Sequence, residues 1–358
     1  MKVGNFMEVN KYKKVNIYKK EIVKEIKNCC FEKQLNILIG SGCSSSSMPL
    51  MSKYSGLSKD EANDRLLEDI IRLSKLFFYK LSTKKYKVVE KFENTKKNYV
   101  EFMEVILEIL NKSNARQTPR AVNIFTTNYD LFIEDAISQI QINNRLVFND
   151  GASGYFARIL DSTNYNKVVA FKGLNDNYIS EIPSINLIKI HGSVNWEMKG
   201  EKVHILNSVS NAPVVVKPTG YESQDTVVNS HFHEMLRVFQ LELDKPQSVL
   251  LVMGFSFQDK HFVKLLRRAI QNPELIIYLF IYSGDGKDIS NNLGYAETTP
   301  PNLKIITPDK IFSKEFMEYC SVSGGTSRLT ITIEEVAEML KQPEKVIKVK
   351  DEVENDEC

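Results

Sequence analysis

One asparagine in this sequence is placed where it could orient a hydroxyl group or a water molecule. Asn128 comes shortly after the apolar run Ala121–Phe125, between Thr127 and Asp130, and a helical pattern follows. A side-chain amide both donates and accepts hydrogen bonds, so it can hold a ribose hydroxyl or an attacking water. For this motif alone, the alternative is that Asn128 and Asp130 only cap the following helix.

A histidine takes the corresponding position after a second apolar run. His191 follows the run Asn186–Ile190 and precedes Gly192, which leaves the imidazole ring accessible. An imidazole titrates near neutral pH and is the usual proton acceptor in enzyme active sites. A structural histidine at the edge of the core is the alternative.

Glycine-containing turns follow two further apolar runs. The first run, Leu35–Ile39, is followed by Gly40, Ser41, Gly42 and Ser44. Glycine allows a backbone to approach a ligand closely, and free N–H groups in such a turn can cradle phosphate oxygens. A tight strand-to-helix turn without a ligand is the alternative interpretation.

The second glycine turn follows the run Ser248–Met253 and begins at Gly254. Ser256 and Asp259 then form a Ser-x-x-Asp pattern that is typical of a helix cap. Backbone and hydroxyl donors at such a position suit a second phosphate or ribose contact.

These motifs require a scaffold that brings the ends of several strands together. Short apolar runs of this kind are typical of strands covered on both faces, as in parallel sheets. The runs are Leu35–Ile39, Ala121–Phe125, Asn186–Ile190, Ser248–Met253, Leu275–Ile281 and Leu303–Ile306. Helical patterns at Leu131–Ile140 and His261–Ile270 alternate with them. The sequence therefore predicts an α/β fold with a doubly wound, Rossmann-like parallel sheet.

A helical insertion is expected at about residues 45–118. A capping box from Ser58 to Glu61 opens one amphipathic helix, and a second helix is expected over Asn98–Leu110. Lysines between them (Lys80, Lys84, Lys85, Lys87 and Lys91) are interpreted as a solvated loop or helix face.

The predicted domain organisation has three parts. Residues 1–34 form a basic N-terminal segment with a helix from Val15 to Ile26, and residues 35–310 form the main domain. Residues 311–358 add a helix at Ile333–Leu340 and a disordered acidic tail. Within the main domain, residues 194–216 alternate as in a hairpin, whereas residues 141–185 have no clear pattern.

Composition narrows the classes of function. The 358 residues carry 47 basic and 45 acidic side chains, so the net charge of +2 does not indicate nucleic-acid binding. No apolar stretch reaches the roughly 18 residues of a membrane-spanning helix, and no secretory signal is visible. The five cysteines form no C-x-x-C pair, which indicates a reducing, cytoplasmic setting and predicts neither a disulfide framework nor a zinc site.

Together the four motifs resemble the NAD-binding signatures of the sirtuin-like (silent information regulator) fold, in order and approximate separation, over residues 30–285. The resemblance implies that NAD is the substrate, that Asn128 and His191 are the catalytic pair, and that Asp130 lies near the nicotinamide. It also implies a set of dinucleotide-binding residues, namely Gly40, Ser41, Gly42, Ser44, Thr127, Gly254 and Ser256.

The chain departs from sirtuin deacylases in lacking their four-cysteine zinc ribbon and their Gly-Ile-Pro-Asp-Phe-Arg stretch. It resembles instead the bacterial sirtuin-like NAD hydrolases of antiphage defence. The resemblance then implies cleavage of NAD⁺ to nicotinamide and ADP-ribose, a homo-oligomer, and a HerA-type ATPase as a possible partner subunit. A protein deacylase or ADP-ribosyltransferase, and a non-catalytic module that senses NAD or ADP-ribose, remain the alternatives.

Overall fold

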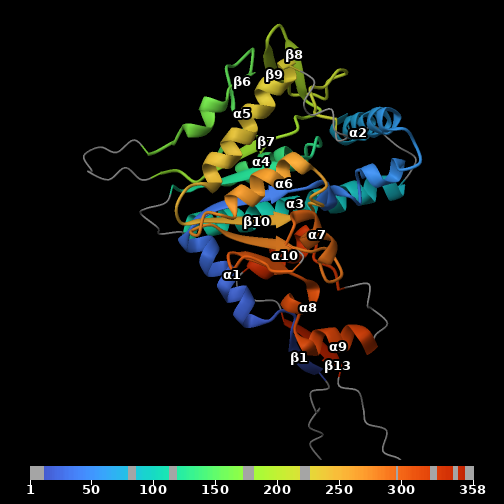
Figure 1. Ribbon diagram of the computed structural model, residues 1–358, viewed down its shortest axis with the longest axis vertical. Coiled ribbons are helices and arrows are strands. Elements are labelled where there is room, and N and C mark those ends of the chain that lie inside the picture. Colours follow the sequence, from blue (N-terminus) through green and yellow to red (C-terminus); the bar gives the residue numbers. More distant parts are fainter. Residues whose placement is uncertain are drawn as a thin grey trace, which may run out of the picture.

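A parallel sheet forms the centre of the protein (Figure 1). The computed structural model describes residues 12–79, 86–112, 119–171, 181–217, 226–295, 297–322, 329–341 and 346–350. The strand order of the seven-stranded sheet is β12-β11-β10-β2-β3-β7-β4, and every neighbouring pair is parallel. In that order the strands are Leu303–Ile306, Ile276–Phe280, Ser248–Met253, Gln34–Ile39, Ala121–Thr126, Ser184–Lys189 and Val147–Asn149. The predicted Rossmann-like sheet is confirmed, and each predicted apolar run forms one of its strands.

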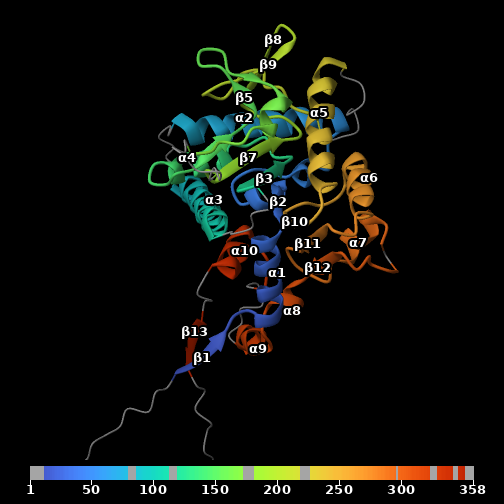
Figure 2. The ribbon, with the colours of Figure 1, turned by 90° about the vertical axis from the view of Figure 1, so that its left-hand side faces the viewer.

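Helices cover both faces of this sheet (Figure 2). Its two faces bury separate apolar clusters because side chains alternate along each strand: Ile37 packs in one cluster and Leu38 in the other. The first face carries α1 (Lys20–Glu32), α3 (Tyr86–Lys112), α4 (Phe132–Gln141) and α10 (Ile333–Leu340). The second face carries α5 (Thr226–Leu243), α6 (Lys260–Ala269) and α7 (Lys287–Leu293). This doubly wound arrangement leaves the strand ends as the accessible edge.

The insertion between β2 and β3 begins with two short 3₁₀ helices, Ser41–Ser44 and Met51–Tyr54, and continues with α2 (Lys59–Tyr79) and α3. The capping box is confirmed, because Ser58 Oγ accepts from the Glu61 N–H at 3.4 Å and Glu61 Oε2 accepts from the Ser58 N–H at 3.2 Å. Helix α3 is longer than predicted and begins at Tyr86. Three of the lysines between the two helices lie outside the described residues.

The N-terminal helix predicted from Val15 is wrong in its first part. Tyr12–Asn16 instead form β1, which pairs antiparallel with β13 (Val346–Lys350), so that Val15 lies opposite Ile347. The helix begins only at Lys20 and buries Val23 and Ile26 completely. Short helices α8 (Pro308–Ile311) and α9 (Lys314–Val322) follow β12. The predicted C-terminal helix is confirmed as α10, and the acidic tail lies outside the described residues.

A small antiparallel sheet, in the order β5-β6-β9-β8, packs beside the main one. The hairpin predicted within residues 194–216 is confirmed as β8 (Trp196–Lys199) and β9 (Lys202–Ile205). Residues 141–185, which have no clear sequence pattern, supply β4, β5 (Ala152–Ser153), β6 (Ile159–Leu160) and the 3₁₀ helix Ser162–Asn166. The described part of the chain has no helix that is both long and apolar enough to cross a membrane.

Four asparagines form a hydrogen-bonded ladder across the middle of the main sheet. Asn149 donates to Asn186 at 3.0 Å, Asn186 donates to Asn123 at 2.8 Å, and Asn123 donates to Asn36 at 2.9 Å. These residues are direct register partners on β4, β7, β3 and β2. Asn123 also donates to Glu242 of α5 at 2.9 Å. The ladder fixes the register of four strands, because a slip of one residue would move each amide to the opposite face.

Candidate active site

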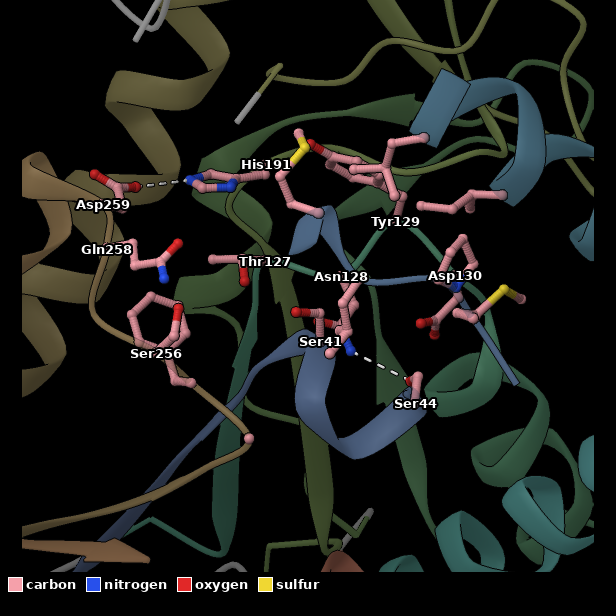
Figure 3. Close-up of a pocket in the computed structure, with 18 of the residues that line it drawn as sticks. Ser41, Ser44, Thr127, Asn128, Tyr129, Asp130, His191, Ser256, Gln258 and Asp259 are labelled. Carbon is pink, nitrogen blue, oxygen red and sulfur yellow. Dashed lines mark hydrogen bonds and ion pairs between the residues drawn. The ribbon is translucent and has the colours of Figure 1, made fainter. Parts of the chain in front are cut away.

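A cavity of about 600 Å³ lies where the parallel strands end (Figure 3). It sits between the turns after β2 and β10, the neighbouring strands from which the chain continues in opposite directions across the sheet. Ligands of open α/β sheets bind at such a switch point. Eight of the ten site residues predicted from the sequence line it: Ser41, Ser44, Thr127, Asn128, Asp130, His191, Gly254 and Ser256.

The other two predicted residues, Gly40 and Gly42, pack against the backbone of Gly254. A Cβ atom on Gly40 would lie 2.3 Å from the Gly254 carbonyl oxygen, and one on Gly42 would lie 2.9 Å from the same atom. The Gly42 N–H donates to that oxygen at 2.9 Å. These glycines therefore join two turns at the floor of the cavity, and a direct contact with dinucleotide phosphates stays a prediction.

Asn128 is buried, with one half of its amide bonded and the other half free. Its Nδ2 donates to the Gly40 carbonyl at 3.2 Å and to Ser44 Oγ at 3.5 Å. Its Oδ1 is buried without a hydrogen-bond partner. An unpaired buried acceptor costs about 1–3 kcal/mol, so such an atom in a cavity indicates a place for a donor from a ligand. The capping alternative is wrong for Asn128, because its side chain makes no bond to helix α4.

Tyr99, a residue of the insertion, contacts the Asn128 amide through Ser44. Tyr99 of α3 is fully buried, stacks on Phe132 and shares a 2.8 Å hydrogen bond with Ser44 Oγ. Ser44 in turn accepts from Asn128, so a chain of hydrogen bonds runs from the inserted helix to the candidate catalytic amide. Sequence patterns gave no indication of Tyr99, since an aromatic residue at helical spacing is typical of a core position.

Asp130 brings a buried carboxyl group to the cavity wall. Its burial raises the pKa, although the charge of Lys189, the Ser44 hydroxyl and the Phe132 N–H oppose this effect. Lys189 is itself buried, donates to the Asp130 carbonyl and pairs with Glu134 at 2.9 Å. Burial also raises the pKa of Glu134 against the opposing charge of Lys189. The ion pair of Lys189 with Glu134 therefore supports the backbone of Asp130 at the cavity wall.

His191 follows β7 and is paired with a carboxylate. Its Nε2 lies 3.3 Å from Asp259 Oδ2, and both side chains are about one-seventh exposed, at 14 % and 16 %. The other oxygen of Asp259 accepts the backbone N–H groups of His261 and Phe262 at 2.8 and 3.1 Å. Burial favours the neutral acid, but the His191 hydrogen bond and charge and these N–H donors outweigh it, so the pKa of Asp259 is lowered.

The turn after His191 is fixed by the backbone around it. Gly192 has φ of +81°, and a Cβ atom there would lie 2.1 Å from the Val214 carbonyl oxygen, so glycine is required. The His191 carbonyl accepts the Val216 N–H at 3.0 Å. Tyr129 lines the cavity and donates its hydroxyl to the Val216 carbonyl. These contacts tie the histidine turn to the asparagine turn.

The insertion supplies an apolar wall that faces these polar groups. Its cavity-lining residues are Met48, Pro49, Leu50, Met51, Leu66 and Ile70. Three basic side chains also line the cavity, namely Lys59 at the start of α2 and Lys260 and His261 at the start of α6. The cavity therefore combines an apolar side for a flat ring with polar and basic groups for hydroxyls and phosphates.

Two features of the site differ from the sequence interpretation. The cap of α6 is Asp259, whereas Ser256 is exposed and lines the cavity. Asp259 is recognisable in the sequence as a cap, but its pairing with His191, 68 positions earlier, is not.

Over the described ranges of the chain, no group of three or more His, Cys, Asp or Glu residues is arranged to hold a metal ion.

Part of the chain matches a known protein family. Residues 122–298 match the family model described as a SIR2-like domain. The match includes the turns that carry Asn128, His191 and Asp259, but not the glycine turn after β2. A search of curated proteins gave no match. The family match supports a sirtuin-like family and, since SIR2-like domains use NAD, an NAD-related function.

Proposed function

We propose that this sirtuin-like chain is an NAD⁺ glycohydrolase, which cleaves NAD⁺ with water to nicotinamide and ADP-ribose. The observation that carries the proposal is Asn128, which lines the same cavity as His191 and whose buried Oδ1 has no hydrogen-bond partner. A buried amide oxygen without a donor is suited to a ribose hydroxyl or a water molecule. The cavity volume of about 600 Å³ lies within the range of small-molecule sites.

The reaction breaks the bond between C1′ of the ribose and the nicotinamide nitrogen. The bonding pair of electrons leaves with nicotinamide, which departs as a neutral molecule, so the leaving group needs no general acid. The transition state at C1′ has oxocarbenium character, as in other glycosyl transfers. A water oxygen then forms the new bond to C1′ and its proton passes to a base.

In this proposal Asn128 orients the water or the ribose, and His191 accepts the proton. General-base catalysis of this kind contributes about 10²- to 10⁴-fold to a rate. The apolar wall formed by the insertion excludes bulk water beside the nicotinamide. Asp130 lies next to Asn128 in the lining and completes the polar side of the cavity.

We extend the proposal, on the resemblance to antiphage NAD hydrolases, to the biological role. The chain would deplete cellular NAD in the bacterial cytoplasm during phage infection, as a homo-oligomer or together with a HerA-type ATPase subunit. Light scattering of the purified chain tests the oligomer. Co-purification with a candidate ATPase from the same cells tests the partner.

The test of the activity is chromatography of NAD⁺ incubated with the purified chain. We expect equal amounts of nicotinamide and ADP-ribose, and a loss of at least about 100-fold in rate for Asn128→Ala and for His191→Ala. Asn211→Ala serves as the matched control, because Asn211 is exposed and does not line the cavity.

Other outcomes identify the alternatives. Wild-type turnover in both cavity variants would contradict the proposed site. Tight NAD⁺ binding without cleavage would indicate a sensing module, and NAD-dependent removal of an acyl group from a lysine peptide would indicate a deacylase. Absence of NAD⁺ binding would overturn the NAD-related function altogether.

A further inference from the structure

The carboxylate of Asp259 is held in a fixed orientation toward His191. One oxygen accepts two backbone N–H groups of helix α6, which fixes the plane of the carboxylate. The second oxygen is left to face His191 Nε2 at 3.3 Å (Figure 3). A carboxylate oxygen is only an acceptor, so the nitrogen that faces it must carry the proton.

We infer that Asp259 is a positioning residue that fixes His191 in the Nε2–H tautomer and thereby makes Nδ1 the proton-accepting atom. A neutral imidazole carries one proton, so a proton held on Nε2 leaves the lone pair on Nδ1. Within the described part of the chain, no hydrogen bond engages Nδ1. This assignment rests on the proposed function, in which His191 is the base.

Within the described residues, Asp259 is the titratable group paired with His191 Nε2. Tyr129 lines the cavity but donates its hydroxyl to the Val216 carbonyl. The other titratable groups in the lining are Lys59, Asp130, Lys260 and His261, and within the described residues none of them has a hydrogen bond or an ion pair with His191. The two nearest in sequence to Asp259 are basic, so they leave its carboxylate as the anion at this end of the cavity.

The pair also has a consequence once the proton has moved. When Nδ1 takes a proton from water, the imidazole becomes a cation with a proton on each nitrogen. Asp259 then faces a positive charge and stabilises it, as a buried carboxylate does for other catalytic histidines. The carboxylate itself stays ionised and does not take the proton.

The first experiment reads the tautomer directly, without reference to activity. The chain contains five histidines, so a long-range ¹H–¹⁵N spectrum of protein labelled with ¹⁵N-histidine is simple to interpret. The His191→Ala variant identifies the His191 signals by their loss. We expect the Nε2–H tautomer in the wild-type chain and the Nδ1–H tautomer in Asp259→Asn.

The asparagine variant is chosen because it keeps the helix cap. Its Oδ1 can still accept the His261 and Phe262 N–H groups, while its Nδ2 presents a donor to the histidine and forces the lone pair onto Nε2. For the reaction we expect a fall in kcat of about 10²- to 10³-fold with little change in KM. Asp259→Ser keeps a capping oxygen and serves as a second variant if Asp259→Asn folds poorly.

The matched control is Thr332→Ala, which removes the N-cap of α10, where Thr332 Oγ1 accepts the Glu335 N–H at 3.2 Å. This variant should lose thermal stability and retain the wild-type histidine signals. If Asp259 only capped helix α6, its variants would behave like Thr332→Ala and would lose stability without a change in the histidine signals. A change in the tautomer of His191 therefore distinguishes a positioning role of Asp259 from a structural one.

The outcomes distinguish this inference from the proposed function. A wild-type tautomer and wild-type kcat in Asp259→Asn, in a chain that cleaves NAD⁺, would overturn the role of Asp259 and leave the hydrolase intact. A reversed tautomer in Asp259→Asn, in a chain that does not cleave NAD⁺, would support the positioning role while the proposed function fails.

Discussion

Two buried asparagines of this protein, Asn123 in the middle of the main sheet and Asn128 at its edge, differ in what their amide groups bind. In the middle of the sheet, Asn123 accepts from Asn186 and donates to both Asn36 and Glu242, so all parts of its amide are used. At the end of the same strand, Asn128 uses only its nitrogen, and its oxygen has no partner. The two residues are five positions apart and almost equally buried, at 5 % and 4 % exposure.

The difference teaches that burial of a polar side chain does not by itself indicate a functional role. The amides of the ladder have hydrogen-bond partners and stabilise one strand register. An amide whose oxygen has no partner can instead accept a hydrogen bond from a ligand. The same residue type therefore serves structure at one position and the candidate chemistry at the other. The three predictions below test that separation.

The largest effect on stability is expected in the ladder. Asn123→Ala removes the hydrogen bonds of Asn123 with Asn36, Asn186 and Glu242, so the free energy of unfolding should fall by about 2–4 kcal/mol. Asn128→Ala should cost about 1 kcal/mol or less, because it also removes the unpaired oxygen. Denaturant unfolding of both variants measures the two values. Equal losses would show that the two amides do not differ in role.

A smaller effect is expected where the insertion contacts the site. Tyr99→Phe removes the hydroxyl that shares a hydrogen bond with Ser44, and should lower the free energy of unfolding by about 1 kcal/mol. Because Ser44 accepts from Asn128, the rate of NAD⁺ cleavage should fall several-fold, by about 5- to 10-fold for a change near 1 kcal/mol. Phe92→Leu is the control, because Phe92 lies in the same helix and also stacks on Phe132 but has no hydroxyl to bond Ser44. An unchanged rate in Tyr99→Phe would show that the hydrogen bond from the insertion to Ser44 does not contribute to catalysis.

The smallest effect, and one of opposite sign, is expected at Asp130. Because burial raises its pKa in the folded protein, ionisation of Asp130 lowers stability. This loss is absent below the unfolded pKa of about 4 and is complete once the pH exceeds the folded pKa. Asp130→Asn should therefore raise the melting temperature at pH 7, and the gain should disappear as the pH falls to about 4. A variant that is less stable than the wild type at pH 7 would contradict this sign.

The sheet could be predicted from the sequence because its signal is local. Strands such as Ser248–Met253 and Leu303–Ile306 consist mostly of apolar residues, and their bounds agree with the prediction. The start of α3 could not be predicted, since residues 86–97 carry many lysines and few apolar residues. Val15 likewise suits a helix or a strand, and its pairing with Ile347 decides the outcome.

The candidate site likewise has residues that local sequence patterns predict and residues that they do not. The turns that carry Asn128 and His191 were recognisable because each follows a predicted strand, and strand ends of a parallel sheet meet at one edge. The roles of Tyr99 and Asp259 depend on contacts with residues 55 and 68 positions away, which no local pattern encodes. The asparagine ladder has no local sequence pattern for the same reason, since its four members lie on four separate strands.

The contact of Gly40 and Gly42 with Gly254 has a consequence for the chain during its synthesis. Strands β2 and β3 are made early and can pair as soon as both are available. The floor of the cavity, however, needs the Gly254 turn, and the partner of His191 follows at Asp259. A nascent chain on the ribosome therefore has no complete cavity until Asp259 has left the exit tunnel, so the proposed cleavage of NAD⁺ would begin only after that point.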